Sequence, residues 1–189
     1  AMTNGRTAIE CGVSPVIGTT GISEAERSDL HRLAANRQIG AFLAPNFAIG
    51  AVLMMEFAAR ASALMPSVEI IELHHENKVD APSGTALLTA ERISAAQLAA
   101  GMAQGATEAP PGSGEAQRSR GEVRGGIHIH SVRLPGLLAH QEVILGAEGQ
   151  TLSLRHDSTD RRCFMPGVIL AARKVRSLRG LVVGLENLL

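Results

Sequence analysis

The sequence predicts an α/β fold in two parts, a helix-flanked parallel sheet followed by an α+β part with an antiparallel sheet. Over residues 7–65, short apolar runs alternate with helical patterns, an order typical of parallel strands joined by helices. After residue 126 the apolar runs follow one another with only turns between them, which indicates antiparallel pairing. Residues 101–124, rich in Gly, Ala, Pro, Ser and Glu, show no apolar periodicity, so we expect a mobile loop there.

Apolar spacing sets the expected elements along the chain. In chain order they are the tail of a helix over 7–12, a strand over 13–17, a helix over 23–36, a strand over 39–43, a helix over 49–65, a strand over 68–73, a helix over 83–100, strands over 127–132, 140–145 and 151–156, and a helix over 161–177. The apolar tail, residues 180–189, is expected to pack on the first part.

Local signals mark the ends of the first elements. The strand over 13–17 ends in the small residues Gly18-Thr19-Thr20-Gly21, which favour a tight turn. Ser23 is a suitable N-cap for the next helix, because acidic residues follow in its first turn, where the helix dipole favours negative charge. The strand over 39–43 closes at Ala44-Pro45-Asn46-Phe47.

The second part begins where Pro66 ends a helix. The run 68–73 is β-branched and apolar, which favours a strand, and the polar stretch 74–82 after it is expected to be a loop. Ser83 begins the next helix, and Gly101 supplies a stop for it.

Composition excludes several functional classes. Lys+Arg and Asp+Glu both number 18, so no broad positive field attracts nucleic acid or a membrane surface. With 2% aromatic residues and no Trp or Tyr, the chain also lacks stacking platforms for single strands. Cys11 and Cys163 form no metal-type spacing and are too few for a secreted scaffold. We therefore expect a cytoplasmic protein with reduced thiols, no nucleic-acid partner and no membrane partner.

The chemistry-bearing segment is residues 72–86, Glu-Leu-His-His-Glu-Asn-Lys-Val-Asp-Ala-Pro-Ser-Gly-Thr-Ala. His74, His75 and Lys78 follow a strand, and the carboxyl ends of strands are where open α/β structures place their sites. An imidazole can give a proton near neutral pH, and an ammonium can hold an anion. Ser83-Gly84-Thr85 opens a helix whose first amides form an anion site, so we expect a substrate that carries carboxylates.

Simpler readings exist for each feature. A His pair can lie in a solvated loop, Lys78 can be an exposed charge, and Ser83 can be a plain N-cap, but their conjunction favours a site. A zinc site, as in a metal-dependent hydrolase, is the other functional reading. Adjacent histidines rarely point at one ion, so no metal site is expected. The candidate ligands for zinc would be His74, His75, His128 and His130.

The string E-L-H-H-x-x-K-x-D-A-P-S-G-T-A over residues 72–86 resembles the signature of dihydrodipicolinate reductases. Further segments agree with that family in the same order along the chain. They are Gly18 to Gly21, Ala44 to Phe47, and the run from Ile129 to Val132 and Arg133 through Pro135-Gly136, His140, Gly149 and His156 to Arg161.

The resemblance implies roles for residues. His74 would donate a proton with Lys78 as its partner in catalysis. In the family a hydride passes from NADPH or NADH to cyclic hydroxy-tetrahydrodipicolinate, with loss of water, in lysine and diaminopimelate synthesis. The implied dicarboxylate contacts are His75, Ser83, Gly84 and Thr85, and the implied cofactor contacts are Gly18, Thr19, Thr20, Ala44, Pro45, Asn46 and Phe47.

The resemblance also implies three regions. Residues 1–46 would be a remnant of a Rossmann-type dinucleotide-binding domain, and residues 47–160 a substrate-binding domain whose open mixed sheet assembles a homotetramer. Residues 161–189 would return to pack on the dinucleotide-binding domain. His128 and His130 alternate with isoleucines and are expected to be structural or interface residues.

One departure from the family concerns the cofactor. The Gly-rich turn G-x-G-x-x-G, which lets a pyrophosphate approach a helix N-terminus, does not occur in the 189 residues. We expect a truncated chain that binds NADPH weakly, and the choice between NADPH and NADH stays open. The alternative function is a non-catalytic oligomerisation or carboxylate-binding module derived from the enzyme.

Overall fold

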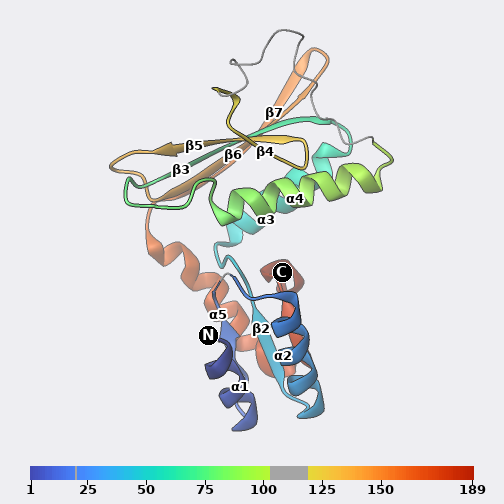
Figure 1. The fold of residues 1–189 in the computed structure, drawn as a ribbon, viewed down its shortest axis with the longest axis vertical. Helices are drawn as coiled ribbons and strands as arrows, with labels where there is room; N and C mark the ends of the chain where they lie inside the picture. Colours follow the sequence, from blue (N-terminus) through green and yellow to red (C-terminus); the bar gives the residue numbers. More distant parts are fainter. Residues whose placement is uncertain (20, 103–118) are drawn as a thin grey trace. The chain divides into compact units, whose positions relative to one another are not determined.

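The computed structural model describes residues 1–19, 21–102 and 119–189. Thr20 and most of the segment expected to be a mobile loop lie outside the described residues. The chain divides into two compact units (Figure 1). Unit 1 comprises Ala1–Val52 and Arg161–Leu189, and unit 2 comprises Leu53–Asp160.

Unit 1 is built on a three-stranded parallel sheet in the order β1-β2-β8. The parallel sheet predicted for the first part is confirmed, and the C-terminal tail adds a strand to it. The tail was expected only to pack on this part. The elements are α1 (Met2–Glu10), β1 (Val16–Ile17), α2 (Glu24–Asn36), β2 (Gly40–Leu43), the 3-10 turn η2 (Arg161–Phe164), α5 (Met165–Lys174), η3 (Val175–Ser177), β8 (Gly180–Val183) and η4 (Leu185–Leu188).

Strand β8 pairs with β2, and η3 before it packs closely on β2. Gly40 pairs with Gly180, and a Cβ on Gly40 would lie 2.0 Å from the carbonyl oxygen of Val175. The His31 ring bonds to the backbone of Leu181 through Nδ1. Apolar residues from α1, α2, β2 and β8 form the core of this unit, including Ile9, Leu30, Ala34, Ala41 and Leu181.

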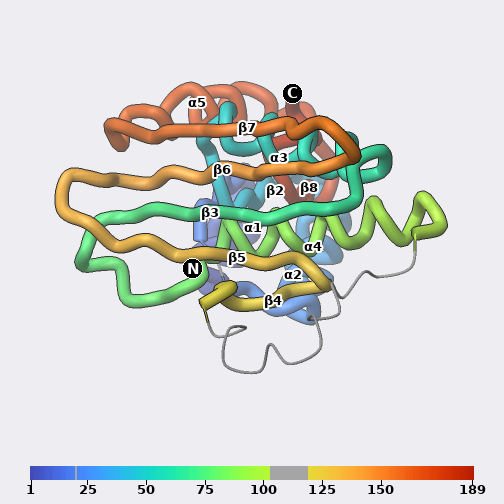
Figure 2. The backbone as a smooth tube through the Cα atoms, turned by 90° about the horizontal axis from the view of Figure 1, so that it is seen from above, coloured from blue at the N-terminus to red at the C-terminus, as the bar shows by residue number. Residues whose placement is uncertain are grey.

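Unit 2 is a five-stranded sheet in the order β4-β5-β3-β6-β7 (Figure 2). β3 pairs parallel with β5 and antiparallel with β6, so the sheet is mixed. The parallel pair arises because the chain crosses over through α4 between β3 and β5. The elements are β3 (Ser67–His74), α4 (Gly84–Ala99), β4 (Glu122–Arg124), β5 (Ile127–Arg133), β6 (Ala139–Ala147) and β7 (Gln150–Ser158), preceded by α3 (Ile49–Ser62), which begins in unit 1.

β4 corrects one sequence expectation. Residues 122–124 were assigned to the mobile loop, but they pair antiparallel with β5. All three side chains of β4 are exposed, so backbone hydrogen bonds rather than an apolar pattern hold this strand.

Helix α4 covers one face of the mixed sheet, where it contacts β3 and β5 (Figure 1). Its inner face carries Ala86, Ala90 and Ile93, all fully buried. Val68, Ile70 and Glu72 are the buried positions of β3, because alternate residues of a strand share one face. The carboxylate of Glu72 therefore lies on the same buried face of β3 as the apolar side chains of Val68 and Ile70.

Candidate functional site

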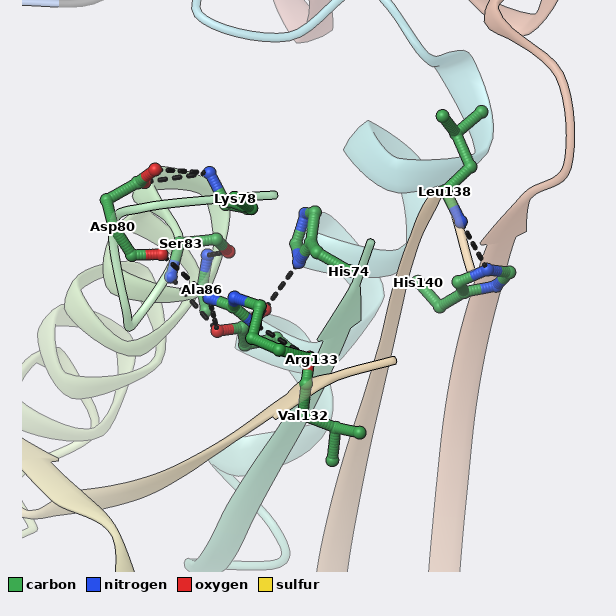
Figure 3. Close-up of polar contacts among 10 residues, drawn as sticks. His74, Lys78, Asp80, Ser83, Ala86, Val132, Arg133, Leu138 and His140 are labelled. Atoms are coloured by element: carbon green, nitrogen blue, oxygen red, sulfur yellow. Dashed lines mark hydrogen bonds and ion pairs between the residues drawn. The ribbon is translucent and has the colours of Figure 1, made fainter. Parts of the chain in front are cut away.

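The candidate site in unit 2 lies where β3 ends and α4 begins. His74 is the last residue of β3, with a side chain 14% exposed, and Ser83 is the N-cap of α4. Glu72, two residues before His74, is fully buried. Figure 3 shows His74, Lys78 and Ser83 gathered at this end of the sheet with Arg133 of β5.

The Glu72 carboxylate joins these elements through both oxygens. Oε2 accepts hydrogen bonds from His74 Nδ1 at 2.5 Å and from Arg133 Nη1 at 3.0 Å. Oε1 accepts from Arg133 Nη2 at 2.8 Å and from the backbone N–H of Ser83 at 3.3 Å. One buried group thus contacts the candidate acid, the start of α4 and the neighbouring strand.

The charge of Glu72 follows from this environment. Burial alone would raise its pKa, but hydrogen bonds from His74, Arg133 and Ser131 lower the pKa to about 2. The carboxylate is therefore ionised across the physiological pH range.

The tautomer of His74 follows from its partner. An ionised carboxylate can only accept hydrogen bonds, so Nδ1 carries the hydrogen in the contact with Glu72. The other ring nitrogen, Nε2, is then the atom that can exchange a proton with a substrate.

Lys78 lies in the loop between β3 and α4. Its ammonium bonds to both carboxylate oxygens of Asp80, at 2.7 and 2.8 Å, and its side chain is 20% exposed. The hydrogen bond from Lys78 lowers the pKa of Asp80. Arg133 Nη2 donates to the carbonyl oxygen of Asp80 at 2.7 Å, so β5 holds this loop from the other side.

The start of α4 supplies amides close to His74. Ser83 Oγ accepts from the N–H of Ala86 at 3.2 Å, as an N-cap does. The first intrahelical bond runs from the N–H of Leu87 to the carbonyl oxygen of Ser83. Gly84 lies in the first turn of α4, where the backbone N–H groups have no acceptor within the helix. A Cβ on Gly84 would meet no heavy atom within 4 Å, and Thr85 follows half-buried. The opening of this helix can therefore accommodate an anion.

His75 lies half-buried in the loop after β3. Its carbonyl oxygen accepts a hydrogen bond from the N–H of Lys78 at 3.1 Å, which tightens the turn between the two residues.

The candidate cofactor residues lie in unit 1, at the carboxyl ends of β1 and β2. The N–H of Ala44 donates to the carbonyl oxygen of Ile17 at 3.0 Å, which joins the two strand ends. A Cβ on Gly18 would approach the Phe47 ring to 3.0 Å, and Asn46 Oδ1 accepts from the N–H of Ala48. Gly18, Thr19 and the segment 44–47 thus come together, whereas Thr20 lies outside the described residues.

This group of residues fits the nicotinamide end of a dinucleotide. Open α/β sheets bind ligands at the carboxyl ends of parallel strands, and the buried Phe47 ring packs against Gly18 at this place. The 189 residues contain no G-x-G-x-x-G turn, which is the motif that binds the pyrophosphate of a dinucleotide.

His128 and His130, the other candidate zinc ligands, bind to protein groups. His130 Nε2 bonds to Glu69 Oε2 at 2.8 Å, and His128 Nδ1 bonds to the carbonyl oxygen of Arg120 at 2.9 Å. Across residues 1–19, 21–102 and 119–189, no group of three or more His, Cys, Asp and Glu side chains is arranged to hold a metal ion. No helix in the described part of the chain is long and apolar enough to cross a membrane.

His140 differs from His74, because both of its ring nitrogens bond to protein groups. Its Nδ1 bonds to Asp157 at 2.6 Å, and its Nε2 accepts from the N–H of Leu138 at 3.3 Å (Figure 3). Both ring nitrogens are engaged within the sheet, which leaves neither for a substrate.

Sequence reasoning assigned no role to Glu72 or Arg133. A signal for Glu72 was present, because the period of two along β3 places it in phase with the apolar Val68 and Ile70. Arg133 carries no local signal, since its partner is distant in sequence.

Comparisons with known proteins agree along the whole chain. The family profile described as "Dihydrodipicolinate reductase, C-terminus" matches residues 50–189, and that described as "Dihydrodipicolinate reductase, N-terminus" matches residues 1–47. The chain is 53% identical over 189 residues to the 4-hydroxy-tetrahydrodipicolinate reductase of Moorella thermoacetica, covering 100% of this chain and 68% of the relative. It is 55% identical over 191 residues to the same enzyme of Thermosynechococcus vestitus, covering 98% of this chain and 66% of the relative.

A solved structure is also similar. The dipicolinate-bound dihydrodipicolinate reductase of Paenisporosarcina sp. TG-14 superposes with a TM-score of 0.85 at 46% identity. The alignment covers 100% of this chain and 69% of that one. The chain thus spans about two thirds of the length of the relatives that it matches.

Proposed function

The chain belongs to the dihydrodipicolinate reductase family of pyridine-nucleotide-dependent oxidoreductases, and we propose that its unit 2 binds a cyclic dicarboxylate for reduction at His74 and Lys78. The observation that carries the proposal is the gathering of an imidazole, an ammonium and the N-terminus of α4 at one end of β3. These groups provide a proton, a positive charge and hydrogen-bond donors, which a carboxylate-bearing ring requires.

The proposed chemistry assigns each group a task. The reduced nicotinamide, NADPH or NADH, supplies the hydride when bound. His74 donates a proton from Nε2 to the substrate, and the Lys78 ammonium stabilises the negative charge that develops there. Ser83, Gly84 and Thr85 at the start of α4, together with His75, hold a substrate carboxylate.

The cofactor is proposed to use the residues of unit 1. By the family resemblance, Gly18, Thr19, Thr20 and the segment 44–47 would contact the nicotinamide ring and its carboxamide. Gly18 and the segment 44–47 follow the carboxyl ends of parallel strands, where such sheets bind ligands. Chemistry of the nicotinamide end does not distinguish NADPH from NADH, since the two differ at the distant ribose 2′ position.

Calorimetric titration with dipicolinate tests the substrate proposal, because this dicarboxylate is bound in the similar solved structure. We expect the 189-residue chain to bind it, and Lys78→Met to weaken binding about tenfold or more, since an ionic hydrogen bond is lost. Lys174→Met is the matched control, because Lys174 is a lysine of unit 1 that donates to the carbonyl oxygen of Leu188. Equal affinity of the Lys78→Met variant and the unmodified chain would contradict the proposal.

A second candidate function is a carboxylate-binding and oligomerisation module without hydride transfer. The groups at the start of α4 support it, because they can bind a carboxylate without a nucleotide. Loss of the absorbance of reduced nicotinamide in the presence of substrate separates the two, because the module would bind dipicolinate without consuming NADPH.

Assembly is a further part of the proposal. By the family resemblance we propose that residues 47–160 bind substrate and build a homotetramer, and that residues 161–189 return to the dinucleotide-binding part. Sedimentation equilibrium tests this, with a tetramer as the expected mass and a monomer at micromolar concentration as the contrary result.

A further inference from the structure

We infer that Glu72 is a positioning residue, which orients the proton donor His74 and the start of the anion-binding helix through one carboxylate. This inference rests on the proposed function of His74. Neither the apolar spacing nor the motif assigned Glu72 a role, and it is the one carboxylate that is buried among the described residues.

One oxygen of Glu72 orients the imidazole of His74. His74 Nδ1 lies 2.5 Å from Glu72 Oε2, and an ionised carboxylate fixes the hydrogen on that nitrogen. The partner of one ring nitrogen sets the state of the other, so Nε2 is kept as the atom that faces a substrate. The bond also sets the plane of the ring, because His74 has no other side-chain partner among the hydrogen bonds of the described residues.

The other oxygen of Glu72 holds the start of α4. Oε1 of the same carboxylate accepts from the backbone N–H of Ser83, at the N-cap of α4. The position of the first turn of α4 is therefore tied to that of the His74 ring through a single group. In the proposed function, His74 and the start of α4 contact the same cyclic dicarboxylate. A link between them keeps their spacing fixed, and small misplacements of such groups lower catalytic rates strongly.

The carboxylate of Glu72 is itself held in place by a guanidinium. Arg133 donates to both oxygens of Glu72 and to the carbonyl oxygen of Asp80. A paired guanidinium offsets the cost of burying the charge and fixes its orientation.

Glu69 provides a matched control on the same strand. Like Glu72 it bonds to a histidine and an arginine, here His130 and Arg120. Its side chain is 40% exposed, and it lies three positions before Glu72 on the strand, so it faces the other side of the sheet.

The test compares Glu72→Gln with Glu69→Gln in the 189-residue chain labelled with nitrogen-15 histidine. In the unmodified chain we expect the His74 ring to carry its hydrogen on Nδ1. In Glu72→Gln we expect a mixture of tautomers and at least tenfold weaker dipicolinate binding, because an amide can donate as well as accept. Glu69→Gln should change neither readout.

Two further variants guard against a folding defect. Glu72→Gln combined with Arg133→Met removes both charges of the pair, so the fold should persist while the His74 tautomer stays mixed. Glu72→Asp keeps the charge, and should restore part of the Nδ1–H population and of the affinity.

The outcomes separate this inference from the proposed function. Failure of the unmodified chain to bind dipicolinate would overturn the proposed function, and the tautomer of His74 would still report on Glu72. Binding by the unmodified chain, with tautomer and affinity unchanged in both Glu72→Gln variants, would overturn the positioning role alone.

Discussion

The guanidinium of Arg133 and the carboxylate of Glu72 face each other across the parallel strands β5 and β3, with two hydrogen bonds of 2.8 and 3.0 Å. Their side chains are 19% and 0% exposed. The pair connects the last residue of β5 to Glu72, two residues before the end of β3, and the guanidinium also donates to the carbonyl oxygen of Asp80 in the loop after β3. Removal of either partner should therefore affect the whole end of the sheet.

The first prediction is that Arg133→Met destabilises the chain by about 3–5 kcal/mol, because it leaves the buried Glu72 charge without its cation. Urea unfolding measures the free energy of unfolding. The double variant with Glu72→Gln should recover much of the loss, since it removes both charges. Additive losses in the double variant would show that the two residues do not act as a pair.

The second prediction concerns acid. The folded-state pKa of Glu72 is about 2, below the ordinary value of 4.5, so its ionisation stabilises the fold above about pH 4.5 and this contribution disappears as the pH falls toward 2. The shift corresponds to roughly 3 kcal/mol. Unfolding free energies measured from about pH 6 down to about pH 3 should fall less steeply in Glu72→Gln than in the unmodified chain. Parallel curves would contradict the low pKa.

The third prediction tests the close packing of β2 against η3, the turn that precedes β8. Gly40→Ala should destabilise by more than about 3 kcal/mol, because the new Cβ would lie 2.0 Å from the backbone oxygen of Val175. Gly146→Ala is the matched strand control, since its Cβ would meet Ser67 at an ordinary 3.8 Å and should change stability by less than about 1 kcal/mol. Thermal unfolding of both variants measures the difference, and a Gly40→Ala variant as stable as the unmodified chain would contradict the close packing of β2 against η3.

The fourth prediction concerns the cofactor. The 189 residues contain no G-x-G-x-x-G turn for a pyrophosphate, so we expect this chain to bind NADPH weakly or not at all while it still binds dipicolinate. Calorimetric titrations with NADPH and with dipicolinate measure the two affinities. Micromolar affinity for NADPH would refute the prediction.

Helix starts were predictable because capping is local. Ser23 caps α2 in a reciprocal box with Glu26, and Ser83 caps α4, both as expected from residues within three positions. The buried strands were predictable for the same reason, since β-branched apolar runs such as that of β3 show their character in a few residues.

Three features escaped the sequence. β4 has only exposed side chains, β8 was expected only to pack as a tail, and Glu72 was given no role. Each depends on a partner far along the chain: β4 on β5, β8 on β2, and Glu72 on Arg133. A distant partner leaves no trace in local periodicity.

The amino-acid sequence alone determined the two-part α/β order, the family and the segment that carries His74, Lys78 and Ser83, because these depend on neighbouring residues or on a continuous motif. The tertiary structure alone decided which groups surround them. A buried carboxylate is stable only where hydrogen-bond donors converge on it. Folding brings Arg133 from a strand 61 residues away to Glu72, and that contact makes the carboxylate a fixed support for the imidazole.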